Sequence, residues 1–391
     1  MSEWQEVKLE DICKFKYGKM PPENVKSDSG FPIYTGYRIS GYANQYLYKD
    51  SMLIVVARGV GGTGDVKISP EQSWITNLSI VLEVDHKKAD KYFLMNLLSQ
   101  SSLKERFDSG SAQSQITIDS LSNLKISLPP LPTQQKIAKI LSNYDDLIEN
   151  NLKRIKLLEE SARLTYEEWF LRFRIDGKKL DIDPETSLPF GWEKRKLVSL
   201  CENFTDGTHD SPKQTDETDS YYLITGKHLA DNKIDFSTAY KISESDFLNI
   251  SKRSGLRKND ILFSNIGTLG YVAMVGKFIE FSCKNVFIFR PLKDVNCYLF
   301  EFLKYEQNKN NFIAQSSGAA QKFISLQFMR SFETAVAPIT TLHEFNKIVS
   351  DTYLQIDNLQ YQNQLLKEAR DILLPRLMTG MIDTDDIGIA V

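Results

Sequence analysis

The glycine-rich run from Gly59 to Gly64 is the stretch whose residue types come closest to a cofactor-binding motif. It matches GxGxxG, follows a predicted strand at 51–56, and has Glu83 about twenty residues further on, as dinucleotide-binding motifs do. Such a motif must open a helix, but the residues that follow contain Pro70 and no apolar helical stripe. The matching stretch later in the chain, 265–270, lacks the pattern. We therefore predict a tight turn between two strands.

Other catalytic or metal-binding motifs are missing from the sequence. The four cysteines form no CxxC pair, and the four histidines form no HxxxH or Cys/His cluster, so we expect free thiols and no metal ligands. There is no phosphate-binding GxxxxGK[ST], no GxSxG and no HExxH, and we predict no catalytic residue. No run approaches 18 apolar residues, and the N-terminus lacks the apolar core of a signal peptide, so we expect a cytoplasmic protein without a membrane span.

Polar loops rich in small residues, glutamine and basic side chains indicate binding rather than catalysis. Their backbone amides and glutamines could meet phosphates or base edges, and an arginine offers a bidentate fork to guanine. Each of them could equally be a solvated loop or surface charge. The net charge of −3 requires any DNA-binding surface to be local. The predicted DNA-contacting residues are Arg38, Arg58, Lys67, Ser111, Gln113, Gln115, Lys227, His228, Asn265, Gln321 and Lys322.

The elements that must position these loops occur twice along the chain. Gly110, Ala112, Gln113 and Ile116 recur 208 residues later as Gly318, Ala320, Gln321 and Ile324, and Asn77 recurs as Asn285. Trp4, Lys8, Leu9 and Cys13 recur 188 residues later as Trp192, Lys196, Leu197 and Cys201. The second copy therefore carries about twenty extra residues, which we place in polar loops at 206–219 and 237–251. In the first copy we predict strands at 31–37, 51–56 and 74–84, a helix at 92–103, and a polar loop leading into a strand at 110–128.

A long helix follows each copy. The first begins after Pro129, Pro130 and Pro132 with Thr133 as a cap, and the second has Thr341 and Glu344 in the pattern of a capping box. Apolar residues recur every three or four positions in both helices, as in a coiled coil in which each helix pairs with the other. The predicted helix-pairing residues are Ile137, Ile140, Tyr144, Ile148, Ile155, Leu158, Phe345, Ile348, Ile356, Leu359 and Leu366.

The length of the linker predicts the direction of pairing. A helix of about forty residues is about 60 Å long, whereas a linker of about sixteen residues spans about 55 Å at most. Parallel helices would require the linker to return the full length, so we predict an antiparallel pair. The predicted fold is mixed α/β: two similar globular domains at opposite ends of an antiparallel two-helix coiled coil, related by an internal pseudo-two-fold repeat. Its parts are a first domain (1–130), a first helix (131–175), a linker (176–191), a second domain (192–337), a second helix (338–380) and a tail (381–391).

The duplicated chain resembles the specificity subunit of type I restriction-modification systems. The resemblance rests on LPPLPTQQKIAKIL before the first helix, LLPRLMTG at the end of the second, and the opening WxxVKLxDI with its echo GWEKRKLVSL. It implies that the two globular domains are target-recognition domains, each of which reads one half of a bipartite, asymmetric DNA target. It also implies that the helices set the gap between the half-sites and dock two methyltransferase subunits, with restriction subunits completing the complex. S-adenosylmethionine, ATP and Mg²⁺ would then belong to partner subunits, and this chain would hold no cofactor.

Two other interpretations remain open at this point. The chain could be a scaffold whose domains grip protein partners and whose helices are only structural, in which case it would leave DNA unprotected in a footprint. It could also be an enzyme that binds a dinucleotide at the glycine turn, in which case Gly61→Ala together with Gly62→Ala would abolish an activity.

Overall fold

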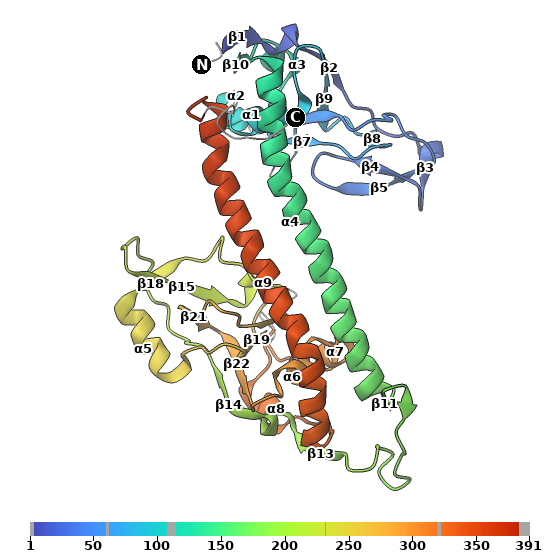
Figure 1. Cartoon of the computed structure of the whole chain (residues 1–391), viewed down its shortest axis with the longest axis vertical. Helices are drawn as coiled ribbons and strands as arrows, with labels where there is room; N and C mark the ends of the chain where they lie inside the picture. The colour runs from blue at the N-terminus through green and yellow to red at the C-terminus, as the bar shows by residue number, and fades with distance from the viewer. Residues whose placement is uncertain (1–3, 60–61, 108–114, 231, 319–321, 383–391) are drawn as a thin grey trace. The chain divides into compact units, whose positions relative to one another are not determined.

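The computed structural model describes residues 4–59, 62–107, 115–230, 232–318 and 322–382. The chain forms two compact units, and Figure 1 traces the order of the elements in colour. Unit 1 comprises Met1–Asn150 together with Asn363–Val391, and unit 2 comprises Asn151–Gln362. Each unit therefore combines one of the two predicted domains with segments of both long helices.

The first domain, in unit 1, is built from two four-stranded sheets and one strand pair. The pair joins β1 (Gln5–Lys8) to β10 (Lys125–Leu128) in antiparallel register. The first sheet, fully antiparallel, has the order β2 (Cys13–Tyr17), β9 (Ser79–Val84), β6 (Leu53–Val56), β7 (Val66–Ile68). The second has the order β3 (Lys26–Ser27), β5 (Ile39–Ala43), β4 (Phe31–Tyr34), β8 (Trp74–Ile75), with β4 and β8 parallel.

Three short helices complete the first domain: α1 (Lys91–Ser99), α2 (Leu103–Phe107) and α3 (Ile118–Ser122). Asp90 begins α1, because its side chain accepts hydrogen bonds from the backbone of Tyr92 and Phe93. All four residues of β6 are buried: Leu53 and Val55 share a core with α1 and the long helices, whereas Ile54 packs on the other face of the strand with Ile75. This buried strand carries the glycine turn at its C-terminal end.

The second domain, in unit 2, repeats this topology, except that its second sheet has three strands instead of four. β13 (Glu193–Lys196) pairs with β23 (Glu333–Val336), and a four-stranded sheet has the order β14 (Cys201–Asp206), β22 (Val286–Pro291), β19 (Ile261–Ser264), β20 (Val272–Met274). A second sheet joins β18 (Lys241–Ser243), β15 (Ser220–Thr225) and β21 (Phe281–Lys284), with β15 and β21 parallel. Gln5 pairs with Leu128 in β1–β10 as Glu193 pairs with Val336 in β13–β23, which gives the predicted offsets of 188 and 208. The internal repeat is confirmed.

The second domain also contains elements that sequence patterns did not predict. These elements are a small hairpin, which joins β16 (Leu229–Ala230) to β17 (Lys233–Ile234), and the helix α5 (Glu244–Ser254). The other helices described in this domain are α6 (Asn296–Lys304), α7 (Glu306–Ala314) and α8 (Leu326–Ser331). The prediction of a polar loop at 237–251 is wrong, because Ser243 caps α5 by accepting from the backbone of Asp246. The single strand predicted at 74–84 is also wrong, because β8 and β9 belong to different sheets and a turn separates them.

The long helices are α4 (Leu131–Tyr166) and α9 (Ile339–Met378). Each begins directly after a proline whose carbonyl oxygen accepts the first helical bond: Gln134 donates to Pro130, and Leu342 donates to Pro338. The predicted caps at Thr133 and Thr341 are therefore wrong, since both residues lie inside the first turn. A π-helical turn (Glu167–Leu171) ends α4, and the hairpin β11 (Arg174–Ile175)–β12 (Lys178–Lys179) follows.

The two helices pair in opposite directions within each unit. In unit 1 the beginning of α4 shares a core with the end of α9, and Asp145 forms a 2.6 Å ion pair with Arg370. In unit 2 the end of α4 shares a core with the beginning of α9, where Tyr166 contacts Phe345. Both observations confirm antiparallel pairing.

Most predicted helix-pairing residues are buried, with one clear exception. Ile137, Ile140, Ile148, Ile155, Phe345, Ile356 and Leu359 are buried, and Tyr144, Leu158 and Leu366 are half-buried. Ile348 is 54% exposed, so its prediction is wrong. The buried face of α9 runs through Phe345, Val349 and Tyr353. Ile348 was predicted by adding the repeat offset of 208 to Ile140 of the first helix. Neighbouring residues of a helix point about 100° apart, so Ile348, one residue before the buried Val349, faces solvent.

Candidate nucleic-acid interface

Three turns of the first domain meet at one place, which we call turn cluster 1: residues 35–38 between β4 and β5, 57–59 at the end of β6, and 76–78 between β8 and β9. The Tyr37 hydroxyl donates a 2.9 Å hydrogen bond to the carbonyl oxygen of Arg58, and the Arg58 guanidinium donates to the carbonyl oxygen of Asn77 at 3.2 Å. Burial raises the pKa of Tyr37, so its hydroxyl stays protonated as a donor. These bonds join the three turns.

The glycine turn is shaped by the ring of Tyr37. A Cβ atom on Gly59 would lie 2.0 Å from the Tyr37 hydroxyl oxygen, and one on Gly62 would lie 2.1 Å from the Tyr37 ring. β6 and β7 flank this turn as an antiparallel pair, so the predicted strand-to-strand turn is confirmed. The glycines therefore make room for a tyrosine of the same domain, and the motif does not open a helix.

Of the six predicted DNA-contacting residues of the first domain, the structure describes four and brings three of them together. Arg38 and Arg58 are exposed in turn cluster 1, and Gln115 is exposed beside Ile116, whose backbone N–H donates to Ala57 at 2.9 Å. Lys67, on β7, is half-buried and forms a 3.0 Å ion pair with Asp65. The predicted contacts Ser111 and Gln113 lie outside the described residues.

The second domain has an equivalent turn cluster 2, formed by 226–228 after β15, 265–270 between β19 and β20, and the segment around Phe323. The backbone N–H of Ile324 donates to Asn265 at 2.9 Å, which repeats the Ile116–Ala57 bond at an offset of 208 for both residues. Gly267 donates in the same way to Lys322 at 3.1 Å. The two clusters therefore share a backbone framework but differ in side chains.

Two predicted contacts of the second domain are interior residues. His228 is buried, its Nδ1 accepts from the backbone of Thr225 at 2.9 Å, and burial lowers its pKa, with Lys227 adding to the effect. Asn265 is also buried. Their burial contradicts a role as exposed DNA contacts, because the framework uses both residues internally. Lys227 and Lys322 are exposed and stay predictions, and Gln321 lies outside the described residues.

A close backbone crossing at the end of β2, repeated at the end of β14, was not predicted from the sequence. A Cβ atom on Gly18 would lie 2.3 Å from the carbonyl oxygen of Thr76, and one on Gly207 would lie 2.2 Å from that of Cys283. Both glycines follow equivalent strands, β2 and β14, and permit the same close crossing. The pairing of Gly18 with Gly207 at an offset of 189 was the available sequence signal.

A polar network missed by the sequence analysis follows Gly207. The ring of the exposed His209 lies 2.7 Å from an Asp206 carboxylate oxygen through Nε2 and 2.8 Å from the Asn285 side-chain oxygen through Nδ1. Arg253, on α5, donates to the carbonyl oxygen of Gly207 at 2.6 Å. The first domain has no counterpart of α5 among its described residues. Arg253 therefore belongs to the second domain alone.

Neither a metal site nor a reactive thiol stands out beside these clusters. Within the described residues, no group of three or more His, Cys, Asp or Glu side chains could hold a metal ion. All four cysteines are free, and burial raises the pKa of Cys13, Cys201 and Cys297 to about 12, which makes them poor nucleophiles. No described helix is long and apolar enough to cross a membrane.

Both domains of the duplicated fold therefore present an equivalent cluster of turns that carries exposed basic or polar side chains. The chain belongs to the type I restriction modification DNA specificity domain family, whose model matches residues 1–160 and 189–368. It is accordingly a subunit that recognises DNA sequence, and neither the family nor its relatives favour the scaffold interpretation.

Individual relatives agree with this assignment. The chain is 24% identical to the type I restriction enzyme MjaVIII specificity subunit of Methanocaldococcus jannaschii, over 99% of this chain and 94% of that protein. It is 23% identical to the MjaIX specificity subunit of the same organism, over 76% of this chain and 69% of the relative. The crystal structure of a type I restriction-modification S subunit from M. genitalium shares the fold, with a TM-score of 0.66 at 18% identity over 96% of both chains.

Proposed function

We propose that each domain reads one half of a bipartite, asymmetric DNA target through its turn cluster. The observation that supports this proposal is the repeated backbone bond beneath unlike side chains. Arg58 in turn cluster 1 is replaced by Ile266 at the same offset of 208, and Arg38 follows β4 whereas Lys227 follows the equivalent strand β15. Because the two domains share a backbone framework but expose different side chains, we expect both to bind DNA in the same way and to prefer different base sequences.

The exposed charges divide into base-reading and phosphate-binding groups. Arg38 and Arg58 carry planar guanidinium groups suited to guanine edges, whereas Lys227 and Lys322 act as point charges toward phosphates. Among the described residues, no ion pair neutralises Arg38, Lys227 or Lys322. The chain's net charge of −3 supplies little non-specific attraction, so partner subunits contribute further positive surface around the duplex.

The long helices support docking of two methyltransferase subunits. Leu157 and Leu164 on α4 are exposed in unit 2, and at an offset of 208 Leu365 and Ile372 on α9 are exposed in unit 1. Each unit therefore presents an equivalent pair of large apolar side chains that water would not favour. One methyltransferase subunit on each pair gives two per chain, with restriction subunits joining that complex.

This chain contributes recognition and no catalysis in the proposed complex. S-adenosylmethionine, ATP and Mg²⁺ act in the methyltransferase and restriction subunits. The match of both copies to the DNA specificity domain family supports this division.

Methylation of a random DNA library by the purified complex of this chain with its cognate methyltransferase subunits tests the proposal. We expect two short conserved half-sites of different sequence, separated by a gap of fixed length. Replacing residues 1–125 with those of another family member should change one half-site only. Methylation without sequence dependence would overturn the proposed function.

A further inference from the structure

The backbone hydrogen bond that follows the close glycine crossing is repeated in the two domains. Lys19 donates its backbone N–H to the last residue of β8 at 3.0 Å, and Thr208 donates in the same way to the third residue of β21 at 2.8 Å. The residues that come next, Met20 and His209, therefore occupy equivalent positions. Met20 is 59% exposed, and the side chain of His209 is 61% exposed. This position faces solvent in both domains but carries a hydrogen-bonding side chain only in the second.

The asparagine that recurs as Asn77 and Asn285 has a different partner in each domain. In the first domain Arg58, at the end of β6, donates from its guanidinium to the backbone carbonyl oxygen of Asn77 at 3.2 Å. In the second domain Ile266 stands at the position of Arg58 and has no hydrogen-bonding side chain. There, Nδ1 of His209 lies 2.8 Å from the side-chain oxygen of Asn285. A nitrogen-bearing side chain thus lies against this asparagine in both domains, but it follows β6 in the first and β14 in the second.

Charged groups of the second domain fix the orientation of the His209 ring. Its Nε2 donates to the Asp206 carboxylate at 2.7 Å, and the side chain of Asp206 is only 13% exposed. Arg253 anchors the same segment, because its guanidinium forms a 3.5 Å ion pair with Asp206 and donates to the carbonyl oxygen of Gly207 at 2.6 Å. The bond to a carboxylate is the stronger kind, so it holds the ring, whereas Nδ1 meets only the neutral amide of Asn285. Nδ1 can therefore exchange this partner for a group on DNA while the ring stays in place.

His209 lies at the same edge of the second domain as turn cluster 2. Thr208 forms a parallel bridge with Lys284, and Lys284 pairs in parallel with Thr225. Neighbouring strands are about 4.8 Å apart, so Thr208 and Thr225 are about 10 Å apart. Because the three segments run in the same direction, the residues that follow them, including His209 and the exposed Lys227, lie at one edge. A distance of about 10 Å corresponds to about three base pairs, so a single half-site can contact both residues.

Turn cluster 2 otherwise offers lysines that suit phosphates, and phosphate contacts carry no sequence information. We propose that His209 takes the place of Arg58 in the second domain, as a specificity-determining residue that hydrogen-bonds one base of the second half-site through Nδ1. The major groove is the place for this contact, because each base pair presents a distinct set of hydrogen-bonding groups there. This inference rests on the proposed bipartite recognition. It places the base-reading side chains of the two domains on different strands of one framework.

Methylation of a random DNA library by the full complex carrying His209→Ala tests the inference, with the first half-site as the internal reference. We expect selection at one base pair of the second half-site to weaken about tenfold, the loss of one base contact, while the first half-site stays unchanged. Met20→Ala is the matched control, because it removes the side chain at the equivalent position of the first domain. It should leave both half-sites unchanged, whereas Arg58→Ala should weaken selection at one base pair of the first half-site.

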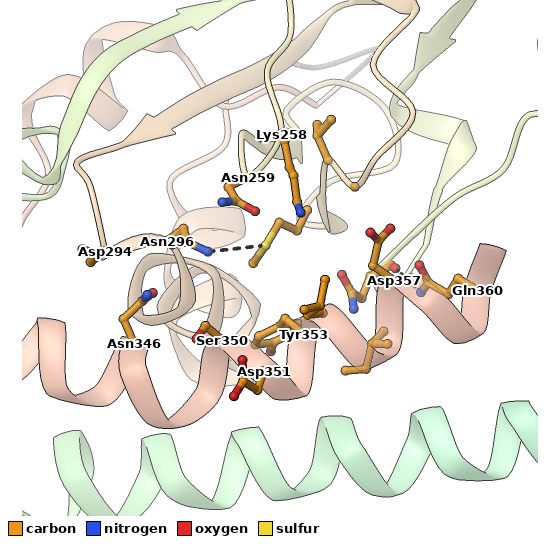
Figure 2. A pocket seen from close by; sticks show the side chains of 16 residues that line it. Lys258, Asn259, Asp294, Asn296, Asn346, Ser350, Asp351, Tyr353, Asp357 and Gln360 are labelled. Atoms are coloured by element: carbon orange, nitrogen blue, oxygen red, sulfur yellow. Dashed lines mark hydrogen bonds between the residues drawn. The ribbon is translucent and has the colours of Figure 1, made fainter. Parts of the chain in front are cut away.

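Two further variants separate base reading from a structural role. His209→Arg should select guanine at the same base pair, because a guanidinium offers guanine a bidentate fork. Lys258→Ala should leave both half-sites unchanged, since it removes an exposed basic side chain of the same domain that faces a hollow of about 300 Å³ against α9 (Figure 2).

Three results would overturn the inference about His209. They are unchanged selection in His209→Ala, equal weakening at every base pair of the second half-site in that variant, and His209→Arg that selects no base at the expected base pair. Equal weakening would mean that His209 only supports the structure of the domain. The unsubstituted complex is measured on the same library, so the presence of two half-sites there keeps each of these results distinct from a failure of bipartite recognition.

Discussion

Substitution of Tyr37 tests whether turn cluster 1 must be held together for the first domain to read DNA. Tyr37→Phe removes the 2.9 Å bond to Arg58 but keeps the ring between Gly59 and Gly62. A neutral hydrogen bond contributes about 1 kcal/mol, so we expect about a fivefold loss of preference for the first half-site. Tyr37→Ala also removes the half-buried ring, and the combined loss of about 2 kcal/mol corresponds to about thirtyfold.

The assay is library methylation by the complex, with the second half-site as the internal reference. Tyr37→Ala should weaken base selection at the first half-site more than Tyr37→Phe does. Both variants should leave base selection at the second half-site unchanged. Tyr46→Phe is the control, since Tyr46 is exposed in the same domain and packs only edge-on against Phe31. Equal weakening of base selection at both half-sites, or full selectivity in Tyr37→Ala, would refute the role of Tyr37 in holding turn cluster 1 together.

Three further predictions concern partner docking, an ion pair and pH. Leu157→Asp, at a residue 71% exposed, should reduce the bound methyltransferase subunits from two to one by light scattering without changing the unfolding midpoint, and two retained subunits would contradict the docking site. Asp260→Asn should lower the free energy of unfolding by about 3 kcal/mol in denaturant titrations, because it leaves the Arg290 guanidinium uncompensated, while the exposed Glu193→Gln should change it by less than about 0.5 kcal/mol. Burial raises the pKa of Glu301, so the folded state is destabilised once the pH is high enough to ionise this carboxyl group, and not at lower pH where the group is protonated. Glu301→Gln should therefore unfold at the same temperature as the unsubstituted chain at about pH 4 and at a higher temperature at about pH 8. Equal unfolding temperatures of the two proteins at both pH values would contradict this.

Periodicity and repetition predicted the features that depend on local sequence. Both long helices were found because apolar residues recur at helical spacing over about forty positions, and only their capping residues were misplaced, each lying inside the first turn. The repeat was found because Asn77 and Asn285 and their neighbours keep a constant offset. The antiparallel direction followed from chain length alone. These are properties that a linear sequence carries without knowledge of packing.

Burial and sheet membership could not be predicted in the same way. His228 and Asn265 looked like exposed polar residues, but tertiary contacts place them inside turn cluster 2. The strands β8 and β9 are consecutive in sequence yet belong to different sheets, which no alternation of apolar residues encodes. Tyr37 and Gly59 are linked by a contact across twenty-odd residues, so neither signalled its role alone.

The composition of unit 1 from two distant stretches bears on the order of folding. Leu377 and Met378, near the end of α9, are buried in the same core as Leu9 and Phe93 of the first domain. A ribosome releases the first domain early but supplies these residues only after the whole second domain. The first domain is therefore synthesised first but completes its core only after the end of α9 has been synthesised. The high sequence separation of these contacts slows their formation. Loss of the last turns of α9 should consequently damage the domain encoded at the other end of the gene.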